Sequence, residues 1–96
     1  MTVPGITGII ESALYVDDIA TSVDFYVRTL GLTPTSEPTG RLCALEVTAC
    51  QVLLLFKRGA STQDKITPTG TIPGTDGAGP LHVTFGIAEG DLQKWR

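Results

Sequence analysis

One sequence pattern occurs twice in this chain of 96 residues. It is a strand with alternating side chains, followed by a helix that begins with acidic residues. The first copy spans residues 9–30 and the second spans residues 80–96. A unit of this kind cannot bury both faces of its sheet by itself, so its duplication is a strong signal about the architecture. The length suits one domain and excludes two independent ones.

The first copy begins with a strand at residues 9–16, where side chains alternate. The face expected under a helix carries Ile10, Ser12, Leu14 and Val16, and the opposite face carries Glu11, Ala13 and Tyr15. Asp17 and Asp18 then offer an N-cap, and apolar residues recur at helical spacing from there to Leu30, before Gly31. Because Asp accepts the free N–H groups of a first turn and glycine ends helices, a helix is predicted between them.

A hairpin follows the helix. Residues 41–47 and 51–57 alternate as two strands that turn near Thr48 and Ala49. Before the hairpin, residues 32–36 allow only a short edge strand, since the proline among them has no N–H to donate to a ladder.

The predicted hairpin register places Cys43 opposite Leu54 and Leu45 opposite Val52. In that register Cys43 and Leu45 share a face with Leu54 and Val52. The two cysteines of the chain are then not cross-strand partners, and both are expected to be free thiols.

Residues 59–79 are rich in Gly, Pro and Thr and show no periodicity, which is typical of a linker or a functional loop. Residues 80–87 alternate again as a strand, with His82 and Thr84 on one face. Residues 89–96 begin a helical pattern that is acidic first and basic last. The second copy therefore contains a strand and a helix start.

Charge and hydropathy exclude several classes of protein. The net charge is −3, whereas nucleic-acid-binding domains usually present a basic patch, so no nucleic acid is expected as a partner. The longest uninterrupted aliphatic or aromatic run, residues 52–56, is far too short to span a membrane. Two cysteines are too few for a disulfide scaffold, and the N-terminus lacks a signal-peptide pattern, so a cytoplasmic location is expected.

The chain resembles the vicinal oxygen chelate superfamily, also called the glyoxalase/bleomycin resistance/dioxygenase superfamily. The resemblance rests on Ile10–Ile19, Ser22–Tyr26, Leu30–Gly31, Val52–Phe56 and Gly79–Phe85. It covers most of residues 9–96. The Phe-Tyr and Leu-Gly pairs become specific when joined to the later Pro-Leu-His-Val-Thr-Phe.

The resemblance implies an α+β fold in which βαβββ modules form curved mixed sheets. On that basis the chain is one domain with a first module at residues 8–58, a linker loop at 59–79 and the start of a second module at 80–96. The expected architecture is a half-barrel cup, with the second module truncated after its first strand and helix start.

The resemblance also implies metal ligands early in the first strand of each module and in the last strand of each. These positions fall on Glu11, Leu54 and His82, and the fourth would lie beyond Arg96. Leucine cannot coordinate a metal, so Glu11 and His82 are the candidate ligands for one divalent ion, either zinc, nickel, manganese or iron. The alternative is that no metal binds, with His82 lining the cup and Glu11 partly solvated.

The cup predicted around these positions is largely apolar, as small-molecule sites are. The expected lining is Ala13, Tyr15, Cys43, Leu45, Val52, Leu54, Phe56 and Thr84. Tyr15 and Cys43 read more simply as a wall ring and an inert thiol than as reactive groups, and no catalytic residue is assigned.

Two functions are expected from different classes, with an inactive truncated member as a third. The first is a metal-dependent lyase, isomerase or dioxygenase, and the second is a metal-free small-molecule binding or sequestering protein of the drug-resistance kind. Leu54 favours the second. A lone half-cup would expose an apolar sheet face, so a homodimer is predicted, either with facing sheets or with residues 80–96 exchanged.

Overall fold

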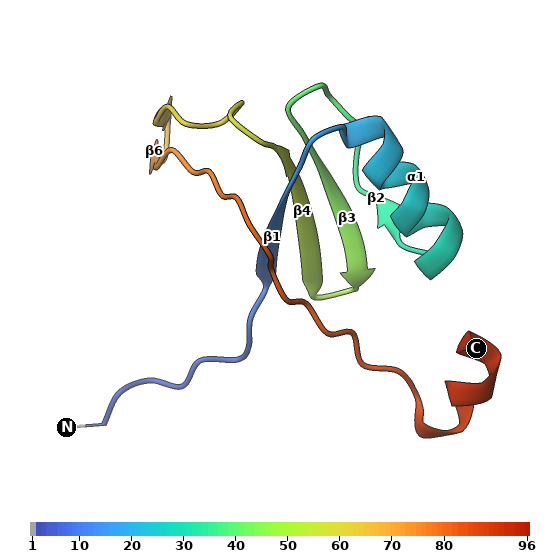
Figure 1. The fold of residues 1–96 in the computed structure, drawn as a ribbon. Coiled ribbons are helices and arrows are strands. Elements are labelled where there is room, and N and C mark those ends of the chain that lie inside the picture. The colour runs from blue at the N-terminus through green and yellow to red at the C-terminus, as the bar shows by residue number, and fades with distance from the viewer. Residues whose placement is uncertain (1) are drawn as a thin grey trace.

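The computed structural model describes residues 2–96, and its centre is a mixed four-stranded sheet with one helix on one face (Figure 1). The strands lie in the order β1-β4-β3-β2, with β1 parallel to β4 and the other neighbours antiparallel. Their bounds are β1 Glu11–Val16, β2 Thr33–Pro34, β3 Leu42–Thr48 and β4 Gln51–Lys57, and helix α1 spans Ile19–Leu30. This βαβββ order in an open sheet confirms the predicted α+β fold.

Helix α1 begins and ends where the sequence predicted. The backbone N–H of Thr21 donates to the Asp18 carboxylate over 3.0 Å, and the Thr21 hydroxyl donates to it as well. These hydrogen bonds stabilise the ionised form and hold the pKa of Asp18 below its usual value. At the other end Gly31 adopts φ 71°, and its N–H donates to the carbonyl of Val27 over 3.1 Å.

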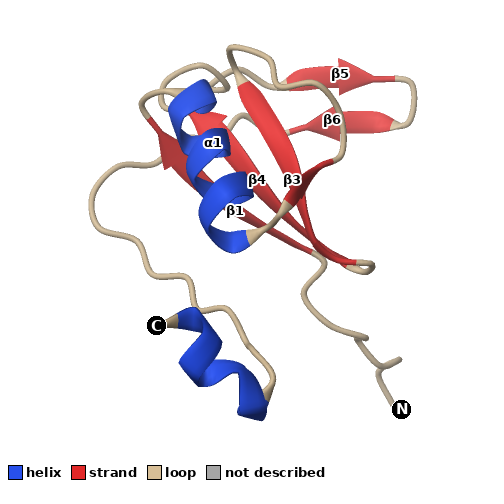
Figure 2. Cartoon of the chain, turned by 90° about the vertical axis from the view of Figure 1, so that its right-hand side faces the viewer, coloured by secondary structure: helices blue, strands red, loops and turns tan. Residues whose placement is uncertain are grey.

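The core lies between α1 and the central strands, as Figure 2 shows with the helix laid across the sheet. The buried side chains are Ile19, Cys43, Leu45, Leu53 and Leu55. Because β4 contributes residues 53 and 55 to this core, residues 52, 54 and 56 must point to the opposite side of the sheet.

The predicted register of the hairpin was wrong by one residue. Cys43 pairs with Leu55 and Leu45 pairs with Leu53, while Leu54 pairs with Ala44. The turn falls at residues 49–50, and the ladder is irregular between Glu46 and Thr48. Since side chains alternate between faces, this one-residue slip moves Cys43 and Leu45 from the predicted cup to the core beneath α1.

The stretch at residues 59–79 is more ordered than its composition indicated. It contains two short antiparallel strands, β5 at Lys65–Thr67 and β6 at Gly70–Ile72. Figure 1 shows this small hairpin on the side of the sheet away from α1, near the C-terminal ends of β1 and β4. The sequence did not predict this hairpin, because strands of only three residues are too short to show an alternating pattern.

The strand predicted at residues 80–87 does not form. These residues run past the sheet without joining a ladder, although Phe85 packs against the core. The expected helix start is present as a 3-10 helix, η1, at Glu89–Trp95. A strand needs a neighbouring ladder for its N–H and C=O groups, and among the described residues none lies alongside this segment.

The chain is extended for its size. Its radius of gyration is 15.6 Å, whereas a compact domain of this length has about 12–13 Å. Its accessible surface is 7560 Å², against roughly 5,300 Å² expected for a compact monomer of this mass. In the part described, residues 2–96, no helix combines the length and the apolar character that crossing a bilayer takes.

Candidate functional site

The sheet face opposite α1, which we call the open face, holds most of the predicted site. Parallel pairing of β1 with β4 places Glu11 beside Val52, Ala13 beside Leu54, and Tyr15 beside Phe56. Leu54 and Phe56 are half-buried, whereas Glu11 and Ala13 are exposed. The face is therefore an apolar strip with a carboxylate at one end and a phenol at the other.

The phenol end of the open face is the more ordered one. The rings of Tyr15 and Phe56 stack with centroids 5.8 Å apart and an interplanar angle of 23°. The Tyr15 hydroxyl is hydrogen-bonded to the hydroxyl of Thr75. Ring stacking and this hydrogen bond fix the position of the Tyr15 ring on the open face.

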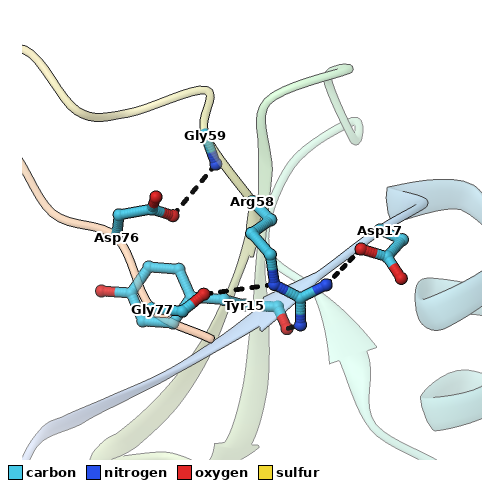
Figure 3. A network of polar contacts seen from close by, with 6 residues as sticks. All are labelled: Tyr15, Asp17, Arg58, Gly59, Asp76 and Gly77. Atoms are coloured by element: carbon cyan, nitrogen blue, oxygen red, sulfur yellow. Dashed lines mark hydrogen bonds and ion pairs between the residues drawn. The ribbon is translucent and has the colours of Figure 1, made fainter. Parts of the chain in front are cut away.

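Arg58, directly after β4, ties three segments together at this end (Figure 3). Its guanidinium donates to the carbonyl of Tyr15 over 3.1 Å and to the carbonyl of Gly77 over 3.2 Å, and it pairs with the Asp17 carboxylate. Asp76 accepts the N–H of Gly59 over 3.0 Å. Backbone N–H groups of Gly59 and Gly77, with the nearby Arg58 charge, lower the pKa of Asp76.

Sequence reasoning missed the part played by Thr75, Asp76 and Gly77. The signal for a turn was present, since residues 74–77 read Gly-Thr-Asp-Gly, a composition typical of tight backbone approaches. Nothing local indicated which strand this turn would contact.

His82 lies in the extended segment after this turn. It is exposed, and its Nε2 lies 2.9 Å from the hydroxyl of Thr84. The intervening Val83 lines a groove of about 460 Å³ with Ile10 and Phe85. The Thr84 hydroxyl therefore occupies one imidazole nitrogen of His82, Nε2.

Two predicted lining residues from β3 do not belong to the open face, and a third, Thr84, lies in the groove with Ile10 and Phe85 instead. Cys43 and Leu45 are 2% and 0% exposed in the core cluster beneath α1. Burial raises the pKa of the Cys43 thiol, because a thiolate is poorly solvated there. Neither side chain is available to a ligand on the open face.

The potential metal donors within residues 2–96 do not complete a metal site among themselves. Among the residues described, 2–96, no group of at least three His, Cys, Asp or Glu side chains is placed to hold an ion. Catalytic sites usually take three protein ligands, and Leu54 occupies a position the resemblance assigned to a donor. Glu11 and His82 alone do not fit a resident metal centre.

The family follows from a comparison with family models. Residues 8–95 match the model of the Glyoxalase/Bleomycin resistance protein/Dioxygenase superfamily. The chain belongs to this superfamily. The resemblance stated from its motifs is thereby confirmed, and the superfamily βαβββ arrangement agrees with the observed element order.

Solved structures share the fold. A lactoylglutathione lyase from Agrobacterium tumefaciens superposes with a TM-score of 0.79 at 29% identity, covering 96% of this chain and 67% of its own. An integron cassette protein from the mobile metagenome of a Halifax Harbour sewage outfall superposes with a TM-score of 0.67 at 17% identity, covering 94% of this chain and 66% of its own. This superfamily chain thus spans about two-thirds of those neighbours' length.

A third neighbour shows the fold alone. An integron cassette protein from V. cholerae gives a TM-score of 0.56 at 23% identity, with 98% of this chain and 68% of its own covered. A search of curated proteins finds no match to the superfamily member described here.

Proposed function

We propose that this superfamily member binds a small, partly apolar molecule on the open face of its sheet. The observation that supports this is the strip formed by Ala13, Leu54 and Phe56, which lies opposite the helix-covered core. Apolar walls with a few polar groups at fixed places are typical of small-molecule sites. Glu11 and Tyr15 supply the polar ends of the strip.

Chemical-shift mapping tests this binding function. A set of small aromatic and aliphatic carboxylates and amides is titrated into the labelled protein, with amide shifts recorded for every residue. Shifts that gather on Ala13, Leu54 and Phe56, and that are lost in Leu54→Lys, support the proposal. Shifts that gather elsewhere, or that persist unchanged in Leu54→Lys but vanish in the matched helix variant Thr29→Lys, contradict it.

A second candidate is metal-dependent lyase, isomerase or dioxygenase chemistry. The specific observation that favours it is the likeness, at 29% identity, to a lactoylglutathione lyase. Glu11 and His82 would be the metal ligands of this chain, and further donors would have to come from outside the described residues.

Metal analysis separates the two candidates. Purified protein is dialysed against zinc, nickel, manganese or iron(II) and its bound metal is measured, beside His82→Ala and Glu11→Gln. Stoichiometric metal that is lost in both variants favours the second candidate. Lactoylglutathione binding that survives a chelator favours metal-free binding.

We also propose a homodimer, on the basis of exposed apolar surface. The accessible surface of one chain exceeds that of a compact monomer by about 2,000 Å², which is more than the roughly 800 Å² that each partner buries in a specific interface of standard size. In the dimer, the partner chain would cover apolar side chains in the segment at residues 81–95, where Leu81, Ile87 and Trp95 are exposed. Sedimentation equilibrium should give twice the 10.1 kDa chain mass, and a concentration-independent monomer would contradict the proposal.

Cytoplasmic location remains a prediction. Cys43 and Cys50 are both free thiols, which suits a reducing compartment. Fractionation with a fluorescent fusion is the direct test.

A further inference from the structure

Residues 58–77, which we call the arm, are connected from base to tip. At the base, the N–H of Gly59 donates to Asp76 over 3.0 Å. Further out, the N–H of Thr75 donates to the carbonyl of Ser61 over 2.7 Å, and the N–H of Gly74 donates to the Asp64 carboxylate over 2.7 Å. The β5–β6 ladder then closes the tip. The two halves of the arm therefore run together as one ribbon rather than as an open loop.

Glycine allows the arm to approach its neighbours closely. A Cβ on Gly74 would overlap the backbone carbonyl of Thr62, so the two halves of the ribbon touch there. A Cβ on Gly77 would lie 2.6 Å from the Tyr15 ring, so the base of the arm rests on that ring. The ring thus has Phe56 and the arm as neighbours, and its hydroxyl is bonded to Thr75.

Arg58 joins the base of the arm to the sheet. Its guanidinium contacts Asp17, at the entrance to α1, together with the carbonyls of Tyr15 and Gly77. The planar fork of arginine donates in several directions at once, which a lysine ammonium on a flexible stem does not reproduce in the same geometry. One side chain thereby connects the outgoing and returning halves of the arm to β1.

The tip of the arm has no comparable support. Ile66 and Ile72 are 84% and 55% exposed, and the hairpin lies on the side of the sheet away from α1 (Figure 1). An isolated two-stranded hairpin is only marginally stable in water. The order of the arm must therefore come from its base, at Arg58 and Tyr15.

We propose that the arm is a strap at the Tyr15–Phe56 end of the open face, which opens and closes as one unit with Arg58 as its fastening. When Arg58 releases Gly77 and Tyr15, the whole ribbon lifts and Tyr15 becomes accessible. Its use as an entrance for a ligand rests on the proposed function. The cooperative opening itself does not.

Hydrogen exchange and tyrosine nitration test the strap without any ligand. In Arg58→Ala, the amides of Gly59, Gly74 and Thr75 should exchange faster by one common factor of about tenfold or more, as expected for losing roughly 1.4 kcal/mol of net hydrogen bonding. Nitration of Tyr15 by tetranitromethane should accelerate in parallel, while Tyr26 in α1 serves as the internal control. Core amides of β3 and β4 report that the fold is intact.

The matched control is Arg28→Ala, which removes an arginine paired with Asp24 over 3.3 Å on the exposed side of α1. It should change neither the arm amides nor Tyr15. If Arg58→Ala does not fold, Arg58→Lys keeps the positive charge near Asp17 but cannot bridge both carbonyls, and it should open the arm in the same cooperative way.

The proposal is overturned if the three arm amides respond by unrelated factors, or if Tyr15 reacts at an unchanged rate when Arg58 is replaced. Neither hydrogen exchange nor nitration uses a ligand. Both therefore test the strap even if the protein binds no small molecule. Conversely, ligand shifts on Ala13 and Leu54 without cooperative opening would support the binding function and overturn the strap.

Discussion

Gly77 lies against the ring of Tyr15 so closely that a Cβ on it would meet the ring at 2.6 Å (Figure 3). The contact joins residues far apart in the chain, one in the first strand and one at the end of the arm. Tyr15 also stacks on Phe56, so the ring links the arm to the open face. Any side chain at position 77 must displace either the ring or the arm.

Gly77→Ala is therefore expected to destabilise the fold by about 1–3 kcal/mol, the usual cost of overpacking. The control is Gly40→Ala, where a Cβ would meet nothing within 4 Å and φ lies outside the left-handed region. Urea unfolding followed by circular dichroism measures both. Equal stabilities for the two variants would show that the contact is not maintained in solution.

Leu55 and Leu54 are a matched pair that tests the assignment of the two faces. Leu55 is fully buried in the core, and Leu55→Ala should cost about 2–5 kcal/mol because it leaves a cavity. Leu54 is half-buried on the open face, so Leu54→Ala should cost less than half as much. A larger loss at Leu54 than at Leu55 would reverse the assignment.

The two thiols should react at very different rates. Cys43 is buried with its pKa raised by loss of solvation, whereas Cys50 is exposed in the β3–β4 turn. Iodoacetamide at pH 8 should alkylate Cys50 rapidly and Cys43 only after denaturation, as peptide mass spectrometry would show. Comparable rates in the native protein would place Cys43 outside the core.

Acid should weaken the start of α1 through Asp18. The folded-state pKa of Asp18 lies below the ordinary value of 3.8 for an aspartate, mainly because the Thr21 hydroxyl and N–H donate to the carboxylate. The stabilisation is therefore complete well above the unfolded-state pKa and is lost as pH falls below about 5 toward the folded pKa. Urea midpoints measured from pH 6 to pH 3 should fall in the wild type.

Asp18→Asn is the variant that isolates this titration, because asparagine caps helices about as well as aspartate but does not ionise. Its urea midpoint should fall less steeply between pH 5 and pH 3 than that of the wild type. Identical slopes would mean that Asp18 does not contribute to the acid dependence. Asp24→Asn, on the exposed side of α1, is the matched control.

The candidate site could be predicted from the sequence only in part. Glu11, Ala13 and Tyr15 were placed opposite the core because the alternate positions of the strand, Leu14 and Val16 among them, are the more apolar set, and the structure has them there. The prediction that Cys43 and Leu45 of β3 line the open face was wrong. Alternation divides the side chains of a strand into two sets but does not say which set faces the helix. Only the turn at residues 49–50 decides that choice.

Helix α1 and the arm differ in how much of their structure local sequence patterns predict. Helix α1 carries its own signals, a capping Asp18 and a terminal Gly31, so both ends were predicted. The arm depends on Arg58, whose partners Asp17, Tyr15 and Gly77 are distant in sequence. No window of neighbouring residues contains that information.

By itself, the order of residues determined the elements from β1 through β4, because caps, glycine stops and alternation act within a few neighbours. Tertiary structure decided the hairpin register, the contact of the arm with Tyr15, and the lack of a ladder at residues 80–88. The physical reason is that a strand and a ribbon are stabilised by the groups beside them, and those groups come from elsewhere in the chain.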